Sequence, residues 1–321
     1  MRPLLVVLVR RVLLGGLLLS TAALPAAAQS GRITVFNAGS LARPLREALR
    51  VWAATTSGVE VAQENAGSLE SARKLTELHK IPDVIALADE AVFPALLLPA
   101  QVSWYAAFAR NEMVLAYTDR SIGAAEITAA NWAAVLQRPG VRTGRSDPAL
   151  DPNGYRTLMV TQLEERRVRT PGLAARLVAV MPPRYVRAKE ADLVALLQAG
   201  ELDYAWSYRS MAEGAGLRWV DLPPEVDLSD PARAELYATV SVKIPGSGSR
   251  VGRDPVTITG APILYALAIP TAAANAPAAR AFVQWLLGPE GRAVLARNGF
   301  TVLDRPIVHG NPPDWLRVLV Q

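Results

Sequence analysis

The sequence predicts an α/β protein built from two lobes with a ligand cleft between them. The chain of 321 residues suits two domains of ordinary size. Hydrophobic residues make up 51% of it and charged residues 20%, a composition that supplies ample core. Strand-like and helix-like patterns alternate along the N-terminal third, which is typical of a parallel sheet built from βαβ units.

The first 28 residues have the pattern of a cleavable secretory signal peptide. Three arginines precede the apolar run VLLGGLLLSTAAL, and Ala26 and Ala28 form an A-x-A cleavage site before Gln29. The apolar run is short for a membrane span, and an uncleaved anchor is the alternative. We therefore expect a soluble, periplasmic mature protein.

Charge and cysteine content exclude several function classes. The net charge is +5, but three arginines and no acids lie in the first 28 residues, which leaves +2 on the mature chain. A nearly neutral chain without a basic block does not predict nucleic-acid binding. Cysteine is absent, so a disulfide scaffold, a thiolate metal site and a thiol nucleophile are excluded.

Five segments alternate between strand and helix at the start of lobe one. Alternating apolar residues predict the strands, and leucines at steps of three and four predict the helices. The segments are the strand 32–38, the helix 40–58, the strand 59–65, the helix 68–80 and the strand 83–88. A strand-like run at 113–118 closes this part of the chain.

The same criteria predict the elements that follow. Helices are expected at 127–137, 154–167 and 191–200, and strands at 141–148, 185–190, 203–210 and 218–222. Two strands within 239–260 flank a Gly/Ser/Arg loop, and an apolar strand covers 261–270. The last helix, 276–299, should bend near Gly288-Pro289 because proline disrupts a helix interior.

These elements divide into two lobes. Lobe one is expected to hold 29–116 plus 265–321, and lobe two 117–264. The chain would cross between them near Ala116–Asp119 and near Gly260–Tyr265, which makes a double-crossing hinge. Small ligands commonly bind in clefts between such lobes.

The pentapeptide NAGSL occurs twice, at 37–41 and 65–69, each time between a predicted strand and a predicted helix. Nothing outside the five letters repeats, so an internal duplication is not supported. Gly39 and Gly67 permit a tight turn and a close approach of a ligand to the backbone.

Ser40 and Ser68 follow these glycines at the two helix starts. The first N–H groups of a helix are unpaired and carry the positive end of its dipole. Two such ends facing one point would bind a small anion without Lys or Arg. The alternative is that both serines are ordinary N-caps, a role that serine favours.

Two further segments are candidates for ligand contacts from lobe two. In SDPALDPNGYR (146–156), turn signals make Asp151 the expected N-cap of the following helix, and a ligand contact is the functional interpretation. In DYAWSYRS (203–210), aromatic and polar residues alternate, and the alternative is a buried strand end with Trp206 in the core.

Catalytic motifs are absent. The sequence contains no GxSxG elbow, HExxH motif or phosphate-binding loop. The two histidines are His79, in a predicted helix, and His309, in a Pro/Gly-rich tail. A secreted serine hydrolase using Ser40 and His79 remains the alternative to a binding protein, without a spacing that favours it. We expect no enzyme activity and no cofactor.

Seven blocks of the chain resemble, in order, the periplasmic molybdate/tungstate-binding proteins of ABC transporters, in the branch first known from archaea. They are FNAGSLARPL, ENAGSLESARKLTEL, DVIALAD, FARNEMVLAYTD, SDPALDPNGYRTLM, LLQAGELDYAWSYRS and TGAPILYALAIP. The resemblance implies a type II periplasmic binding protein fold that closes on a tetrahedral oxyanion. It also implies molybdate or tungstate as ligand and an ABC transporter permease as partner. We expect a monomer, and another oxyanion such as sulfate is the alternative ligand.

The resemblance also implies which residues hold the oxyanion. From lobe one they are Gly39, Ser40 and Ser68. From lobe two they are Asp151, a candidate direct ligand of the oxyanion's metal, and the backbone of Pro152 and Asn153 behind it. No separate metal site is implied.

One position departs from the family pattern. The branch has a Glu in a D-Y-A-x-E-Y-R block, whose carboxylate, with that of the Asp, raises the metal's coordination from four towards six. Ser207 stands at this place, followed by Tyr208. A serine can donate a hydrogen bond but supplies no charge. We therefore expect Ser207 or Tyr208 to contact the ligand, a four- or five-coordinate metal with weaker preference for tungstate, and a structural ion pair for Arg209.

Overall fold

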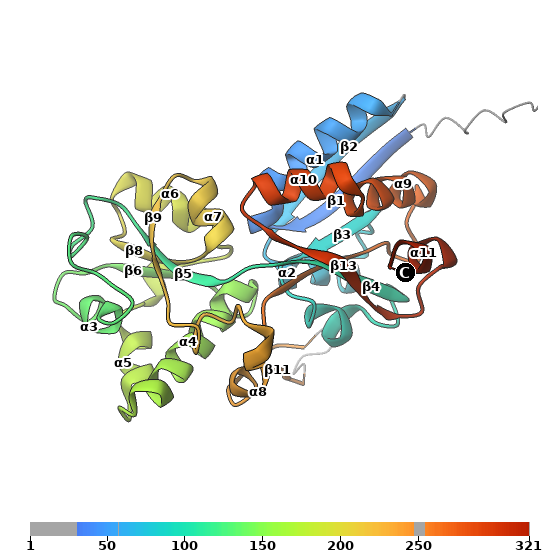
Figure 1. Cartoon of the computed structure of the whole chain (residues 1–321). Coiled ribbons are helices and arrows are strands. Elements are labelled where there is room, and N and C mark those ends of the chain that lie inside the picture. The colour runs from blue at the N-terminus through green and yellow to red at the C-terminus, as the bar shows by residue number, and fades with distance from the viewer. Residues whose placement is uncertain (1–30, 57, 247–253, 321) are drawn as a thin grey trace, which may run out of the picture.

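The computed structural model describes residues 31–56, 58–246 and 254–320. The two larger β-sheets, each covered by helices, form two lobes side by side (Figure 1). This confirms the predicted fold class. The expected signal peptide (1–28) and most of the Gly/Ser/Arg loop (247–253) lie outside the described residues. Within the described ranges, no helix is long and apolar enough to cross a membrane.

Lobe one is built on a six-stranded sheet. The first three strands are parallel, as predicted, and the other three run antiparallel to their neighbours. In spatial order they are β13 (Thr301–Gly310), β4 (Trp104–Arg110), β12 (Leu264–Ala268), β3 (Val84–Leu87), β1 (Gly31–Ala38) and β2 (Val59–Ala66).

Helices of both chain halves cover this sheet. They are η1 (Gly39–Leu41), α1 (Ala42–Thr55), α2 (Ser68–Thr76), η2 (Phe93–Leu97), α9 (Ala276–Leu287), α10 (Pro289–Arg297) and α11 (Asp314–Val320). Trp52 of α1 packs edge-to-face on Phe282 of α9, with ring centroids 5.2 Å apart. The predicted bend is confirmed, because α9 ends before Gly288 and α10 begins with Pro289.

Lobe two is built on a five-stranded sheet. Its strands, in spatial order, are β7 (Val186–Arg187), β6 (Thr143–Ser146), β8 (Tyr204–Tyr208), β5 (Met113–Tyr117) and β9 (Arg218–Asp221). Its helices are α3 (Trp132–Leu136), α4 (Pro152–Val168), α5 (Leu173–Ala179), η3 (Pro183–Tyr185), α6 (Ala191–Ala199) and α7 (Arg209–Gly214). The predicted helix 127–137 is shorter than expected, and α5 was not predicted.

A small unit follows β9 and lies beside α4 below the two sheets (Figure 1). It contains η4 (Pro231–Arg233), α8 (Ala234–Tyr237) and the antiparallel pair β10 (Ser241–Ile244) and β11 (Val256–Thr259). The predicted pair of strands around the Gly/Ser/Arg loop is therefore present.

The first crossing between the sheets occurs at Asn111–Glu112, earlier than the predicted Ala116–Asp119. The physical reason is the burial of β5, whose five residues all pack inside lobe two between β8 and β9. Two later segments lie beside this crossing: the Asp227 carbonyl accepts from Met113 N at 2.8 Å, and the Ile263 carbonyl accepts from Asn111 N at 3.4 Å. The full lobe boundaries, 29–116 plus 265–321 and 117–264, stay predictions.

Candidate functional site

The two NAGSL segments lie side by side in the same register. In the parallel pair of β1 and β2, Asn37 stands opposite Asn65, and Ala38 stands opposite Ala66. The Asn37 side-chain amide donates to Asn65 Oδ1 at 2.8 Å, which ties the two strand ends together. Both turns therefore leave the same edge of the sheet, and the structure brings the two serines onto one side of lobe one.

Neither serine acts as an N-cap. The N-cap positions of η1 and α2 are Ala38 and Gly67, and neither start has a side-chain cap hydrogen bond. Ser68 Oγ accepts from Ala88 N at 3.0 Å, and Ser40 accepts from the Tyr265 hydroxyl at 2.9 Å. Both serines are buried, and each keeps its own hydroxyl proton to donate. The N-cap alternative is thus wrong for both.

The start of α2 is in contact with lobe two. Leu69 N and Glu70 N donate to the Leu150 carbonyl at 3.0 and 3.2 Å. The expectation that these N–H groups are unpaired is therefore wrong at this turn. Gly67 makes the approach possible, because a Cβ at this position would lie 2.3 Å from the Leu150 oxygen.

Asp151 is the N-cap of α4 and faces the boundary between the lobes. Its Oδ1 accepts from Asn153 N at 2.8 Å and from Ser146 Oγ at 3.1 Å. Burial raises the pKa of this carboxyl to about 6, although these hydrogen bonds and one from the Glu190 backbone oppose the rise. Pro152 and Asn153 form the buried first turn of α4. The N-cap interpretation of Asp151 is therefore confirmed, and a ligand contact from its carboxyl group stays a prediction.

Arg156 joins the lobes and was not singled out from the sequence. Its Nη1 donates to the Ala88 carbonyl at 2.6 Å and to the Tyr208 hydroxyl at 2.8 Å, and Nη2 lies 3.1 Å from Asp89 Oδ2. The Tyr155 hydroxyl also donates to Asp89. The place of Arg156 in the second turn of the helix that Asp151 caps did not by itself mark it as a site residue, and its burial is known only from the structure. The Arg156 guanidinium places a buried positive charge beside the acidic side chains at the boundary between the lobes.

Ser207 and Tyr208 end β8, where both are buried. Ser207 Oγ donates to Oε1 of Glu190 at 2.6 Å, and Tyr208 N donates to the same oxygen at 2.6 Å. Glu190 was not predicted as a site residue. A second carboxyl group, that of Glu190, therefore lies within hydrogen-bond distance of Ser207, at the position where the sequence pattern lacks an acid.

Glu190 is a fully buried acid. Burial is the main cause that raises its pKa to about 8; the hydrogen bond from Ser207 lowers it, and the nearby charge of Asp151 raises it further. Its second oxygen, Oε2, has no hydrogen-bond partner among the residues that the structure describes. A buried polar atom without a partner is rare and calls for an explanation.

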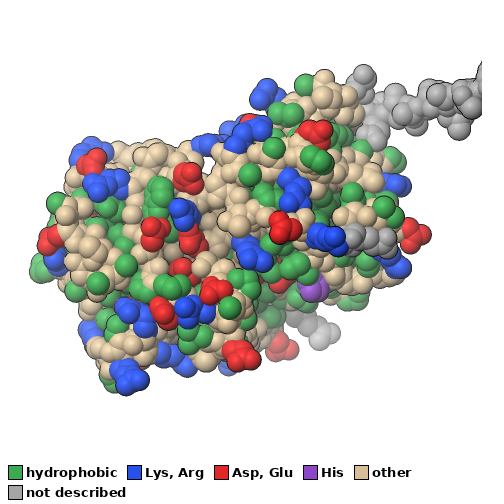
Figure 2. Space-filling model, in the orientation of Figure 1, with side chains coloured by type: hydrophobic (Ala, Val, Ile, Leu, Met, Phe, Trp, Pro, Cys, Tyr) green, Lys and Arg blue, Asp and Glu red, His purple; other side chains and the backbone are tan. Residues whose placement is uncertain are grey.

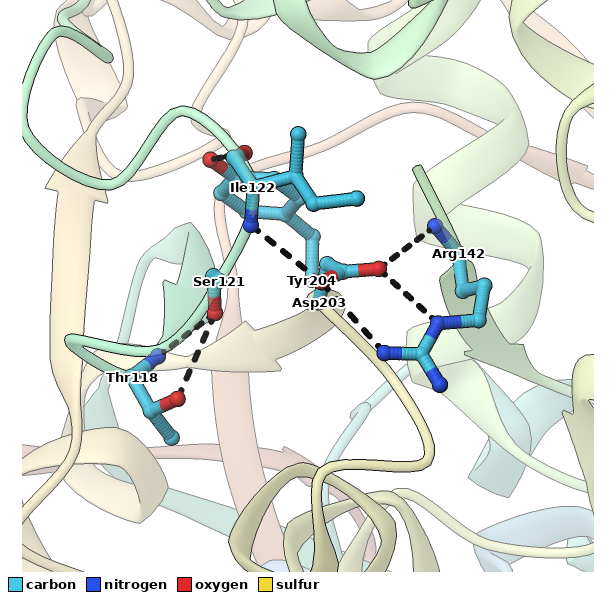
Figure 3. Close-up of polar contacts among 6 residues, drawn as sticks. All are labelled: Thr118, Ser121, Ile122, Arg142, Asp203 and Tyr204. Carbon is cyan, nitrogen blue, oxygen red and sulfur yellow. Dashed lines mark hydrogen bonds and ion pairs between the residues drawn. The ribbon is translucent and has the colours of Figure 1, made fainter. Parts of the chain in front are cut away.

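The start of β8 is held by Asp203, at the opposite end of the strand from Ser207. Its Oδ2 accepts from the backbone N and the Nε of Arg142 at 2.9 and 3.0 Å, and its Oδ1 accepts from Ile122 N at 3.2 Å (Figure 3). This network anchors the strand and thereby positions its far end. Arg209 pairs with Glu112 at 2.7 Å, which confirms the predicted structural ion pair.

The histidines do not support a hydrolase. His79 is exposed beyond the end of α2, and His309 stacks on Tyr105, with ring centroids 4.8 Å apart. Within the described residues, no hydrogen bond joins either histidine to Ser40. The described part of the chain also holds no group of three or more acids and histidines arranged for a metal cation.

Together these groups suit a small anion rich in oxygen atoms. The boundary between the lobes forms a narrow groove, and charges of both signs are scattered over the visible face (Figure 2). A cavity of about 180 Å³ lies along the boundary, lined by Ser40 and Gly39 of lobe one and by Ala191 and Ser210 of lobe two. Serine hydroxyls and a buried guanidinium can donate to an oxyanion without a cofactor.

Comparison with known proteins shows which family the chain belongs to. Residues 33–301 match the family described as bacterial extracellular solute-binding protein. The chain belongs to this family. It is a family of transport proteins rather than of enzymes.

Relatives cover nearly the whole chain. An uncharacterized solute-binding protein of Petrotoga mobilis is 40% identical over 292 residues, which covers 90% of this chain and 87% of the relative. The molybdate/tungstate-binding protein WtpA of Thermococcus kodakarensis is 33% identical over 315 residues, with coverage of 90% and 87%.

Solved structures share the fold at low identity. The periplasmic molybdate-binding protein of Azotobacter vinelandii is 16% identical with a TM-score of 0.55, and the match covers 85% of this chain and all of that one (100%). The sulfate-binding protein SubI of Mycobacterium tuberculosis is 15% identical with a TM-score of 0.59, covering 85% and 87%. At this identity the likeness concerns the two-lobe fold.

Proposed function

We propose that this protein captures molybdate or tungstate outside the cytoplasm and delivers it to an ABC transporter permease. The observation that carries the proposal is the 33% identity to WtpA over 90% of the chain. Two features of the fold support it: the Ser40 and Ser68 turns follow neighbouring parallel strands, and the second turn bonds to Leu150, the residue before Asp151.

The chemistry of the site suits a tetrahedral dianion. Ser40 and Ser68 each retain a hydroxyl proton, and Arg156 supplies a buried positive charge. Hydrogen bonds to a charged acceptor are about twice as strong as neutral ones. Selection against sulfate and phosphate would depend on the size of the site and on the protonation state of the anion.

Ligand binding should stabilise the closed arrangement through contacts that only this arrangement makes. Three hydrogen bonds join the lobes in the arrangement described and are candidates for such contacts: the two to the Leu150 carbonyl and the one from Arg156 to the Ala88 carbonyl. The closed form of a periplasmic monomer, released from its signal peptide, would then dock onto the permease.

Calorimetric titration of the mature protein with molybdate, tungstate, sulfate and phosphate tests the proposal. We expect heat of binding with molybdate or tungstate and weak or no binding of the other two. Binding of sulfate alone would favour the alternative oxyanion, and no heat with either metal oxyanion would overturn the proposal. Loss of ester hydrolysis on Ser40→Ala substitution would indicate a hydrolase instead.

A further inference from the structure

We propose that Glu190 replaces the family's acid at position 207 and supplies the second carboxylate of the oxyanion site. The inference rests on the proposed function. The second carboxylate would then come from the turn between β7 and α6, whereas the family pattern places it on β8. Four features of the structure support it.

The first feature is the place of Glu190 between the two NAGSL turns. A Cβ built on Gly39 would lie 3.4 Å from Cβ of Ala191 and 3.7 Å from Lys189, and one on Gly67 would lie 3.2 Å from the Ala188 carbonyl. The segment 188–191 of lobe two therefore passes both turns of lobe one. Glu190 lies in the middle of this segment, between the residues that contact the first turn and the one that contacts the second.

The second feature is the direction of the side chain. Glu190 occupies the N-cap position of α6, but its side chain makes no cap hydrogen bond. It turns instead towards β8, where Oε1 accepts from Ser207 Oγ and Tyr208 N. Two short hydrogen bonds to one oxygen fix the rotamer and leave the other oxygen for a different partner.

The third feature is that free oxygen. Oε2 is buried and has no hydrogen-bond partner among the described residues. Nearby, Asn153 Nδ2 at the start of α4 is a second buried side-chain atom without a partner in that part of the chain. Leaving a buried polar group unsatisfied is unfavourable. A bound molybdate or tungstate would supply both partners, because its metal can take Oε2 as a ligand and its oxygens can accept from Asn153 Nδ2.

The fourth feature is the proximity of Asp151. The Glu190 backbone N–H is bonded to the Asp151 carboxylate, and each carboxyl group lies within electrostatic range of the other. Two carboxyl groups are thus held at one place by backbone and side-chain hydrogen bonds. Ser207 becomes a positioning residue, which holds Glu190 rather than the ligand.

The bonding consequence is specific. Asp151 and Glu190 would each add one oxygen to the metal of a bound MoO₄²⁻ or WO₄²⁻, whose four oxygens stay in place. Two bonds form and none breaks, so the metal's coordination rises from four to six without any oxidation or reduction. This replaces the four- or five-coordinate metal that the sequence alone led us to expect.

X-ray absorption of the unmutated protein with bound tungstate is the first test, because it does not depend on a variant that folds. We expect a six-oxygen shell. A four-oxygen shell would overturn the inference and leave the proposed function intact. Absence of bound tungstate would overturn the proposed function itself.

Calorimetry of variants then assigns the carboxylate. Glu190→Gln keeps the size and the acceptor oxygen, and we expect at least about a tenfold loss of tungstate affinity with a smaller oxygen shell. The double variant Glu190→Ser with Ser207→Glu moves the acid to the family position and should recover most of that affinity.

The matched control is Glu164→Gln, which alters an equally buried acid paired with Arg167 at the other end of α4. It should leave tungstate affinity unchanged. Unchanged affinity of Glu190→Gln in a protein that binds tungstate would contradict the role of Glu190.

Discussion

The two copies of NAGSL have the same sequence and different surroundings. The copy at 37–41 passes through a single 3₁₀ turn before α1, and its serine accepts from Tyr265 within lobe one. The copy at 65–69 enters α2 directly, and its backbone is in contact with the Leu150 carbonyl of lobe two. Both turns lie beside lobe two, but identical local chemistry produces one turn whose serine bonds within its own lobe and one whose backbone donates hydrogen bonds to the other lobe.

This difference shows what a repeated motif contributes to an anion site. The five letters place a glycine and a serine at a strand-to-helix turn, twice, in the same register. What each turn then binds depends on the segment that faces it. Four predictions use this comparison, and they follow in order of the expected effect.

The largest effect is expected from Arg156→Met. The substitution leaves the Asp89 carboxylate buried without its cation. It also removes the hydrogen bond to the carbonyl of Ala88, the residue whose N–H donates to Ser68 Oγ. Removing one partner of a buried ion pair costs about 3–5 kcal/mol of unfolding free energy. Urea denaturation of the unliganded protein measures the loss.

The control for this substitution is Arg209→Met. Arg209 and Glu112 form a largely exposed pair, which we expect to contribute less than about 1 kcal/mol. Equal losses of unfolding free energy in the two variants would show that the Arg156–Asp89 pair does not stabilise the turn that carries Ser68.

The next effect distinguishes the two glycines. In Gly67→Ala the new methyl group would meet the Leu150 oxygen at 2.3 Å, whereas in Gly39→Ala the nearest atom lies at 3.4 Å. Overpacking of this kind costs about 1–3 kcal/mol, here in the closed state. We expect Gly67→Ala to weaken molybdate binding by about tenfold or more and Gly39→Ala to change it little.

Calorimetry measures the affinities of both glycine variants. Small-angle scattering with ligand shows whether Gly67→Ala remains more open than the parent. Similar affinities for the two variants would mean that the close approach at Gly67 has no part in closure.

A smaller effect is expected for the serines in the absence of ligand. Ser68→Ala leaves the buried Ala88 N–H unpaired, at a cost of about 1–3 kcal/mol. Ser40→Ala removes the acceptor of the Tyr265 hydroxyl. This hydroxyl can rotate towards another acceptor, unlike a backbone N–H, and it still accepts from Asn111 at 3.4 Å, so the loss should be smaller. Thermal unfolding of the two unliganded variants compares them, and a larger loss for Ser40→Ala would reverse the comparison.

The fourth prediction concerns pH, where the change in stability is spread gradually over several pH units. Burial raises the pKa of Asp151 from 3.8 to about 6 and that of Glu190 from 4.5 to about 8. A raised pKa in the folded state means that the folded protein binds more protons in this range, so its stability falls as pH rises. Between pH 6 and pH 8 the decline should come mainly from Glu190.

Melting temperatures of the unliganded protein from pH 5 to pH 9 test this expectation. Glu190→Gln should flatten the upper part of the profile, whereas Asp151→Asn should flatten the part below about pH 6. Asparagine is also a good N-cap, so the second variant should still fold. A parent profile that rises between pH 6 and pH 8 would contradict the assignment.

Much of the fold was predictable because it follows from local patterns. The alternation of strands and helices in lobe one, the break at Gly288-Pro289 and the cap at Asp151 depend on residues close together in the chain. The strand β13 was missed, since it pairs with β4, far away in sequence. The first crossing was misplaced because the sequence pattern of β5 does not show which sheet it joins.

The candidate site was predictable only in part, for the same reason. Ser40, Ser68 and Asp151 carry recognisable turn chemistry, so the sequence singles them out. Glu190 and Arg156 have no such pattern, and they matter because the fold buries each of them against partners in other segments.

The sequence by itself determined the local geometry: two glycine turns, serines at two helix starts and an acid at the start of a third helix. Only the tertiary structure decided which partner each group has. It gave Ser40 and Ser68 partners other than the helix N–H groups that they would cap. It paired the N–H groups at the start of α2 with the Leu150 carbonyl of lobe two. It also placed Glu190 beside Ser207, the position where the sequence lacks an acid. Hydrogen bonds and burial of this kind join distant segments, and no local pattern encodes them.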